Sequence, residues 1–250
     1  MRLSIPSDLG PFIEGLSAKA ERVRSLQLPA PSRESLDHKL RIELTHGSTA
    51  IEGNTLTLRE TQLLIDEGIT PASAKQLREL HETINHDAAV RRIQEWVPEK
   101  RPLTVAAICE IHRIVLRSID DERAGKYRDA RVLVTGAPLQ PIRPERIPEE
   151  MDRLFAEIGD WTGSTIVLAT MAHYDFVKIH PFFDGNGRAG RLLFNWILLA
   201  AGYPLTVIPA EERARYITSL DQADLGDAVG FFELMAECVE RSLDQYLELA

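Results

Sequence analysis

The chain has only two cysteines in 250 residues, Cys109 and Cys238, and neither has the spacing of a metal ligand. This excludes a disulfide scaffold and a cysteine zinc site, so we expect two reduced thiols in a cytoplasmic protein. Long apolar runs are also lacking: no segment offers a secretory h-region or about twenty apolar residues for a membrane span, so we expect no membrane partner. Basic side chains are too few to offset the acidic ones, and a formal net charge of −9 argues against nucleic acid as the main partner.

The composition is that of an ordinary globular protein, with 44% hydrophobic and 27% charged residues. Helical periodicity dominates the chain and predicts an all-α fold. The expected helices are 7–26, 33–51, 57–67, 73–96, 104–117, 148–160, 163–179, 187–201, 210–220 and 227–249. One region, 127–142, breaks this pattern, because a β-prone run is followed there by Gly136-Ala137-Pro138 and a second extended piece. It predicts a small β-hairpin.

Residues 178–191 read Lys-Ile-His-Pro-Phe-Phe-Asp-Gly-Asn-Gly-Arg-Ala-Gly-Arg and combine a base, a carboxylate, turn glycines and arginines. His180 precedes a proline, so the helix before it should stop there and leave the imidazole at the mouth of a loop. A neutral imidazole in that position can take a proton from a hydroxyl group near neutral pH. Asp184 is a hard oxygen ligand of the kind that Mg²⁺ takes singly, alongside waters and phosphate oxygens.

The second half of the run suits a polyphosphate. Gly185 and Gly187 can adopt positive φ, so their N–H groups and that of Asn186 can form an anion-binding nest at the start of the next helix. Arg188 and Arg191 are neighbours on one helix face, where their planar guanidinium groups can donate hydrogen bonds to phosphate oxygens. The alternative is a plain Asp-Gly-Asn-Gly turn between two helices. The His-Pro before it and the Arg-x-x-Arg after it argue against a plain turn.

This run resembles the signature of the Fic family, His-Pro-Phe-x-Asp-Gly-Asn-Gly-Arg-x-x-Arg, at every specified position. The resemblance implies a mostly helical Fic-type fold with a β-hairpin flap that transfers AMP from ATP to a Tyr, Thr or Ser hydroxyl of a target protein. It assigns the following roles: His180 is the base, Asp184 holds Mg²⁺ or Mn²⁺, Gly185, Asn186 and Gly187 bind the α and β phosphates, and Arg188 and Arg191 hold the β/γ end. The target would dock on the flap as an extended segment.

A second segment, Ser48-Thr49-Ala50-Ile51-Glu52-Gly53-Asn54, resembles the family's inhibitory motif, placed upstream of the core as in the class with an N-terminal inhibitory helix. Ser48 and Glu52 lie one turn apart on one helix face, and Gly53 is suited to ending that helix. The alternative is an ordinary helix end whose glutamate faces water. By resemblance, Glu52 would pair with Arg191 and deny it to the γ-phosphate. The stretch 51–58 also resembles the animal endoplasmic-reticulum branch of the family, and some enzymes with this glutamate remove AMP as well.

These motifs suggest two regions: a helical N-terminal region, 1–98, with the inhibitory helix at 33–54, and a Fic core, 99–250, with the flap at 127–142 and the catalytic loop at 180–191. The sequence leaves a homodimer open. His173 is interpreted as a hydrogen-bonded core residue, and His38, His46 and His112 as surface or core residues without a ligand role. Two other functions stay open: transfer of another phosphate-linked group, such as UMP, phosphocholine or a γ-phosphate, and a silent ATP- or peptide-binding module. The phosphorylating death-on-curing branch has Lys in place of Gly187, which favours adenylylation.

Overall fold

The fold of the described residues is a bundle of α-helices without a β-strand, seen in a computed structural model that describes residue 3 and residues 7–71 and 77–249. The helices are α1 Gly10–Ser25, α2 Ala30–Ile51, α3 Leu58–Glu67, α4 Leu77–Trp96, α5 Val105–Val115, α6 Ile147–Gly159, α7 Thr165–Ile179, α8 Asn186–Ala200, α9 Arg213–Asp224 and α10 Val229–Glu248. Short 3-10 turns lie at Ser7–Leu9, Pro144–Arg146 and Ala210–Glu212. The all-α prediction and its ten helices are therefore confirmed, although the expected start of the fourth, at 73–76, lies outside the described residues.

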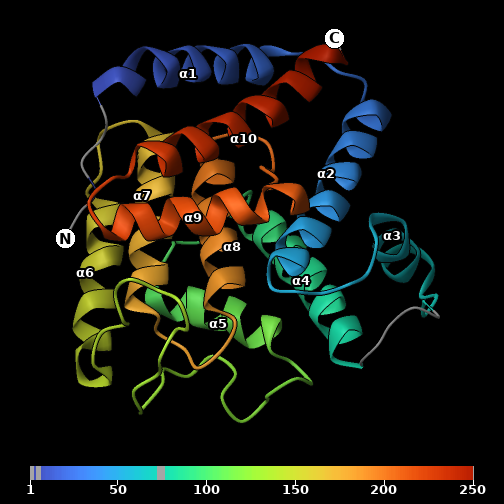
Figure 1. Ribbon diagram of the computed structural model, residues 1–250. Helices are drawn as coiled ribbons and strands as arrows, with labels where there is room; N and C mark the ends of the chain where they lie inside the picture. The colour runs from blue at the N-terminus through green and yellow to red at the C-terminus, as the bar shows by residue number, and fades with distance from the viewer. Residues whose placement is uncertain (1–2, 4–6, 72–76, 250) are drawn as a thin grey trace.

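The helices α7 and α8 form an antiparallel pair at the centre of the molecule (Figure 1). α4 and α5 pack against the lower half of α8, α6 covers α7, and α10 runs across the upper end with α1 on its outer side. α2 descends along one edge and packs on both α4 and α8. Its lower end therefore reaches the end of the central pair where the loop between α7 and α8 lies.

α2 begins three residues earlier than the sequence predicts, at Ala30. The reason is Pro31: it stands in the first turn of the helix, where its missing N–H has no helical partner to lose. The helix ends at Ile51, and Gly53 then takes a φ of +99°, which a glycine tolerates without strain. Both ends of α2 thus follow from local sequence.

A single hydrophobic cluster runs from Leu9 near one end of the chain to Tyr246 near the other. Trp96 at the end of α4 and Trp196 within α8 meet inside it, with ring centroids 5.1 Å apart. The core is thus continuous across the proposed boundary at residue 98, and the division into two regions stays a prediction.

The expected β-hairpin at 127–142 does not form, and this prediction of the sequence analysis is wrong. Residues 131–134 belong to no helix or turn, and they pair with no strand among the described residues. The side chain of Gln140 takes the place of one: it accepts a hydrogen bond from the N–H of Val134 at 2.9 Å and donates one to the carbonyl of Val134 at 3.2 Å. The segment remains a turn-containing arm, called the flap below.

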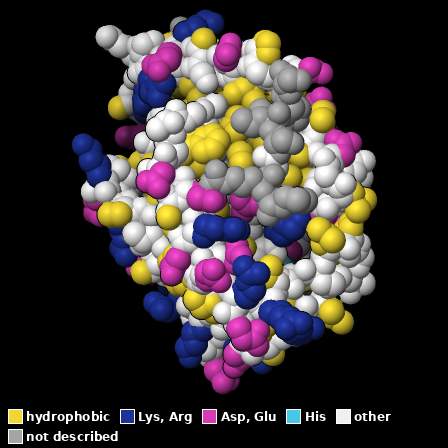
Figure 2. Space-filling model, turned by 90° about the vertical axis from the view of Figure 1, so that its left-hand side faces the viewer, with side chains coloured by type: hydrophobic (Ala, Val, Ile, Leu, Met, Phe, Trp, Pro, Cys, Tyr) yellow, Lys and Arg dark blue, Asp and Glu magenta, His cyan; other side chains and the backbone are white. Residues whose placement is uncertain are grey.

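Charges of both signs are interspersed on the face shown in Figure 2, where no broad basic area lies. Hydrophobic side chains gather in the upper half of that face. None of the helices within the described ranges combines the length and the apolar character that a membrane span requires.

Candidate active site

The loop between α7 and α8 is held in an unusual backbone conformation. His180 follows the last residue of α7 and has φ +52° and ψ +59°, a left-handed geometry that is uncommon outside glycine. Its N–H still donates to the carbonyl of Phe176 at 3.0 Å, so the helix ends at the histidine that precedes proline, as the sequence predicts. Such a costly conformation persists only where neighbours impose it, which makes it a marker of function.

Arg128, in the flap, is one of those neighbours. Its guanidinium donates to the carbonyl of His180 at 2.8 Å and to that of Ala130 at 3.0 Å, and its own N–H donates to the carbonyl of Pro181 at 2.9 Å. The arginine is 2% exposed. A buried fork of donors therefore fixes the backbone of the catalytic loop from 52 residues away in sequence.

His112, in α5, supports the other side of the loop. Its ring stacks on Phe182, with centroids 3.6 Å apart and planes 5° apart, and its Nε2 lies 2.9 Å from the carbonyl of Asp184. The N–H of Gly125 donates to Nδ1 at 2.9 Å, so Nδ1 accepts and Nε2 carries the proton. Burial lowers the pKa of His112 to about 4 and keeps this arrangement neutral. His112 is thus a buried core residue, which is one of the two expected possibilities, and in addition it positions the loop.

Asn186 closes the loop rather than offering its side chain to a ligand. Its Oδ1 accepts from the N–H of Phe182 and its Nδ2 donates to the carbonyl of Phe182, each at 2.9 Å. Gly185, with φ +78°, and Asn186 then begin α8. The nest therefore offers a ligand the backbone N–H groups at the N-terminus of α8, a position that stabilises a bound anion.

The imidazole of His180 is suited to be a base. Burial is the main influence on it and lowers its pKa, and the nearby Arg128 lowers it further. The folded protein therefore keeps His180 unprotonated near neutral pH, ready to accept a proton.

Arg191 brings the two sequence motifs together. It is 2% exposed, its Nε donates to Ser48 Oγ at 2.9 Å, and its Nη2 donates to the carbonyl of Ser48 at 2.8 Å. Nη2 also lies 2.8 Å from Glu52 Oε1, which forms the ion pair that the sequence predicts. Behind it, the Tyr216 hydroxyl lies 3.0 Å from His173 Nε2, so His173 is a hydrogen-bonded core residue as expected.

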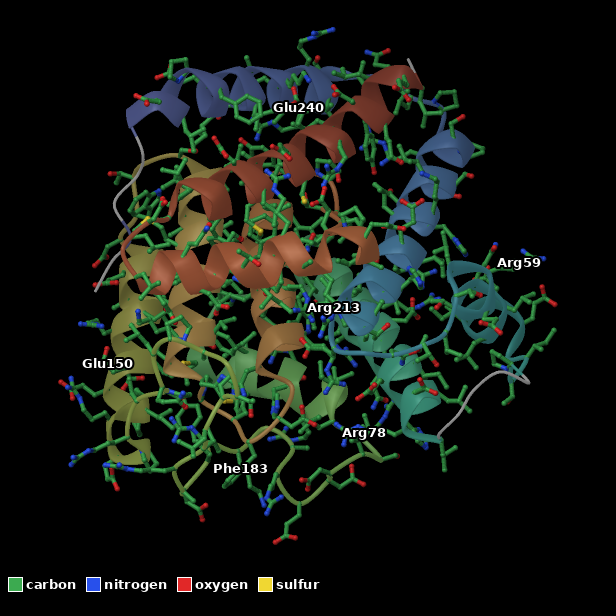
Figure 3. All side chains as sticks on the ribbon, viewed as in Figure 1. Arg59, Arg78, Glu150, Phe183, Arg213 and Glu240 are labelled. Carbon is green, nitrogen blue, oxygen red and sulfur yellow. The ribbon has the colours of Figure 1, made fainter. Side chains whose placement is uncertain are left out.

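The carboxylate of Glu52 lies against the nest itself. A side chain at Gly187 would collide with Glu52 Oε1, so glycine is required there with Glu52 in this position. Arg213 steadies the end of the helix, since its Nε donates to the carbonyl of Ile51 at 2.8 Å (Figure 3). α2 thus delivers a negative group to the place where the nest would take an anion.

Asp184 belongs to a ring of four charged groups, which we call the charge ring: Asp184, Arg78, Glu82 and Arg188. Arg78, in the first turn of α4, donates to the Asp184 carboxylate and, through Nε, to Glu82 Oε1 at 2.9 Å. Arg188 is 3.3 Å from Asp184 Oδ1 and 3.5 Å from Glu82 Oε1. Burial alone would raise the pKa of Asp184, but Arg188 and Arg78 more than offset it and lower that pKa.

Two nitrogens of Arg188 are buried and make no hydrogen bond in the described structure: Nε, and Nη1, which has only the ion pair with Glu82 at 3.5 Å. Buried donors of this kind are rare unless a ligand satisfies them. They lie beside a polar pocket of about 420 Å³ lined by Glu52, Gly53, Asn54, Thr55, Arg78, Glu79, Glu82, Asp184 and Arg188. A largely apolar pocket of about 180 Å³ lies on the other side of His180, between the flap and α9.

A divalent cation fits Asp184 by the chemistry of its donors. Among the described residues no three His, Cys, Asp or Glu side chains converge on a common point, so a zinc-type cage is absent from that part of the chain. Mg²⁺ and Mn²⁺ need no such cage, because they retain waters and take phosphate oxygens beside one or two carboxylates. The Asp184 side chain is 44% exposed and borders the polar pocket, which leaves room for that hydrated type of site.

The sequence predictions place His180, Asp184, Gly185, Gly187, Arg188, Arg191, Ser48, Glu52 and Gly53 in one site, and the structure brings all of them together. Their chemical roles stay predictions. Sequence reasoning missed His112, Arg128, Arg78 and Glu82, which lie on three separate segments. No spacing pattern links these to the loop, so only the fold reveals them.

Comparison with known proteins gives consistent matches. The sequence profile of the Fic/DOC family matches residues 102–198. The protein adenylyltransferase fic-1 of Caenorhabditis briggsae is 37% identical over 209 residues, which are 80% of this chain and 40% of that protein. The protein adenylyltransferase Fic of Drosophila melanogaster is 32% identical over 236 residues, 94% of this chain and 48% of that protein.

Solved structures agree with these sequence matches. Fic-1 residues 134–508 from C. elegans align with a TM-score of 0.85 at 31% identity, over 96% of this chain and 72% of that one. A Fic-domain-containing signaling protein from Bacteroides thetaiotaomicron aligns with a TM-score of 0.83 at 30% identity, over 95% of this chain and 96% of that one. The chain spans 40% to 48% of the length of the curated relatives just described.

Proposed function

Because this chain belongs to the Fic/DOC family, we propose that it transfers AMP from ATP to a Tyr, Thr or Ser hydroxyl of a target protein. The observation that carries the proposal is the neutral, half-buried imidazole of His180 beside a helix N-terminus with two buried arginines. A base next to an anion-binding nest can promote attack of a hydroxyl group on phosphorus, because the base takes the proton and the nest binds the phosphate. A pure binding module has no use for that base.

These contacts support the following reaction. His180 takes the proton of the target hydroxyl as its oxygen bonds to the α-phosphorus, and the bond from that phosphorus to the bridging oxygen breaks, releasing pyrophosphate. The N-terminus of α8 and Arg188 stabilise charge on the phosphates, and Arg191 does so once Glu52 leaves it. A divalent cation, Mg²⁺ or Mn²⁺, held by Asp184 would neutralise the charge of the departing pyrophosphate.

The flap is the place where we expect the target to bind. Residues 131–133 belong to no helix or turn, and their backbone is paired with no strand among the described residues, so a target segment can add to them as a strand. Leu133 is 84% exposed at this point. The apolar pocket next to His180 is suited to the adenine base, since aliphatic side chains line most of it and His180 stands at its wall.

Label transfer tests the reaction. Label from the α-phosphate of ATP should become covalently attached to protein, and label from the γ-phosphate should not. His180→Ala should abolish incorporation, whereas His38→Ala, a change of the same kind on the exposed face of α2, should leave it intact. Incorporation of γ-label alone would replace this proposal with a kinase.

We also propose that Glu52 restrains the forward reaction and can drive its reversal. Its carboxylate lies against Gly187 in the nest, so with a modified target bound it could accept a proton from water while protonated His180 returns one to the leaving hydroxyl. The test uses a target labelled by the Glu52→Gly variant and freed of ATP. Release of AMP by the wild-type protein but not by Glu52→Gln supports this activity, and equal release by both excludes it.

The cytoplasm is the compartment that we propose. Cys109 and Cys238 are both free thiols, and burial raises the pKa of each, so neither is reactive. This is the state expected in a reducing compartment.

A further inference from the structure

The guanidinium of Arg78 pairs with the carboxylate of Asp184, the group that would bind the divalent cation in the proposed reaction. Its guanidinium donates to Asp184 from 106 residues away in sequence, and its Nε is 2.9 Å from Glu82 (Figure 3 labels Arg78 at the lower end of the molecule). No sequence motif contains Arg78. Its position follows from the packing of α4 against α8.

The charge ring is neutral as it stands, because the two carboxylates of Asp184 and Glu82 balance the two guanidiniums of Arg78 and Arg188. A divalent cation added to this neutral set would raise its charge to about +2, which opposes binding at short range. Glu52 and Glu79 also line the polar pocket, but Glu52 pairs with Arg191 and Glu79 accepts from the N–H of Thr55. Withdrawal of one arginine of the ring, or arrival of a polyphosphate with the cation, is therefore the direct way to favour the cation at Asp184.

The two arginines differ in their freedom to withdraw. The side chain of Arg188 is 2% exposed and is enclosed by α8 and its neighbours. The side chain of Arg78 is 49% exposed and stands in the first turn of α4 at the rim of the polar pocket. Moving Arg78 into water costs little, since exposed ion pairs contribute only about 0 to 1 kcal/mol, so Arg78 is the group that yields.

We propose that Arg78 occupies the place of the cation on Asp184 and competes with it, so that Arg78 sets the affinity of the site for the divalent ion before nucleotide arrives. This inference rests on the proposed function, which assigns the cation to Asp184. It makes Arg78 a positioning residue for Asp184: in the resting protein it keeps the carboxylate oriented, and it gives that carboxylate up to a stronger charge.

Binding of Mn²⁺ to the nucleotide-free protein tests the competition, with free Mn²⁺ followed by electron paramagnetic resonance. Arg78→Gln should bind Mn²⁺ about five-fold more tightly than the wild-type protein, the fold-change that corresponds to about 1 kcal/mol. Arg92→Gln is the matched control, because Arg92 is on the same helix, is similarly exposed and pairs with Glu95. It should bind Mn²⁺ as the wild-type protein does.

The double variant Arg78→Gln/Asp184→Asn should lose the whole gain in Mn²⁺ affinity, because the gain depends on the Asp184 carboxylate. The inference is overturned if Arg78→Gln binds Mn²⁺ no more tightly than Arg92→Gln, or if the gain persists without the Asp184 carboxylate. Arg78→Met, which keeps the aliphatic stem on α4, should repeat the result of Arg78→Gln. If Arg78→Gln binds Mn²⁺ more tightly but the wild-type protein transfers no α-label, only the proposed reaction is excluded. If the wild-type protein transfers α-label but Arg78→Gln gains no Mn²⁺ affinity, only the proposed competition is excluded.

Discussion

Arg191 is the residue on which the two sequence motifs converge, since it belongs to the catalytic loop motif and contacts Ser48 and Glu52 of the inhibitory motif. Each motif is local and readable by itself. Their contact joins residues 139 apart in the chain, and in the sequence alone only the resemblance to the family indicates it. No motif contains the residues that hold the loop in place, His112, Arg128 and Arg78. Single residues without a spacing pattern cannot be assigned to a site from sequence, so only the folded structure identifies them.

At this scale we predict that Glu52→Gly raises the incorporation of α-label about ten-fold. Arg191 is then free to bind the γ-phosphate, and a ten-fold effect corresponds to about 1.4 kcal/mol of binding free energy. The gain should vanish in an Arg191→Ala background, because both residues act through one contact. Glu67→Gly is the matched control: Glu67, like Glu52, is followed by a glycine of positive φ at the end of a helix, but it lies on α3 and is not among the Arg191 contacts described above. A gain of similar size in the control would show that helix fraying is responsible.

At the scale of elements, the placement of α2 decides where Glu52 lies. Arg41 of α2 pairs with Asp87 of α4, and the two side chains are 8% and 9% exposed. Arg91 also contacts Asp87, at 2.8 Å. The helix ends were predictable because prolines, glycines and capping residues act locally. The flap was not, because Gln140 replaces a strand partner through side-chain hydrogen bonds that β-propensity does not encode.

We expect Asp87→Asn to destabilise the protein by about 3 to 5 kcal/mol, because it leaves Arg41 buried without a counter-charge. Urea unfolding measures this loss. Glu95→Gln breaks an exposed pair on the same helix and should change the free energy of unfolding by less than about 0.5 kcal/mol. Equal effects of the two substitutions would mean that the Arg41 pair does not anchor α2.

For the whole molecule, the buried histidines predict sensitivity to acid. Burial lowers the pKa of His173 to about 3 and that of His112 to about 4, below the ordinary value near 6.5. The unfolded chain therefore binds more protons than the folded one between roughly pH 6.5 and these values. The free energy of unfolding should fall as pH decreases through this window, by about 1.4 kcal/mol per pH unit for each histidine.

Urea midpoints at pH 7, 6 and 5 measure this dependence. His173→Gln removes one buried imidazole, so the slope of its unfolding free energy against pH should be smaller by about one proton. His38→Gln, a change of the same kind at a more exposed site on α2, is the matched control against which the slope of His173→Gln is compared. Parallel curves for the wild-type protein and His173→Gln would contradict the prediction.

The contact between Trp96 and Trp196 gives the protein a built-in optical probe. Trp96 is the last residue of the helix that carries Arg78, and Trp196 lies on the helix that carries Arg191, so the contact between the two rings joins the elements on the cation side and the phosphate side of the site. Indole emission depends on the immediate surroundings of the ring. Any shift of α4 against α8 therefore changes intrinsic fluorescence, and ligand-driven rearrangement can be timed in a stopped-flow instrument without attaching a dye.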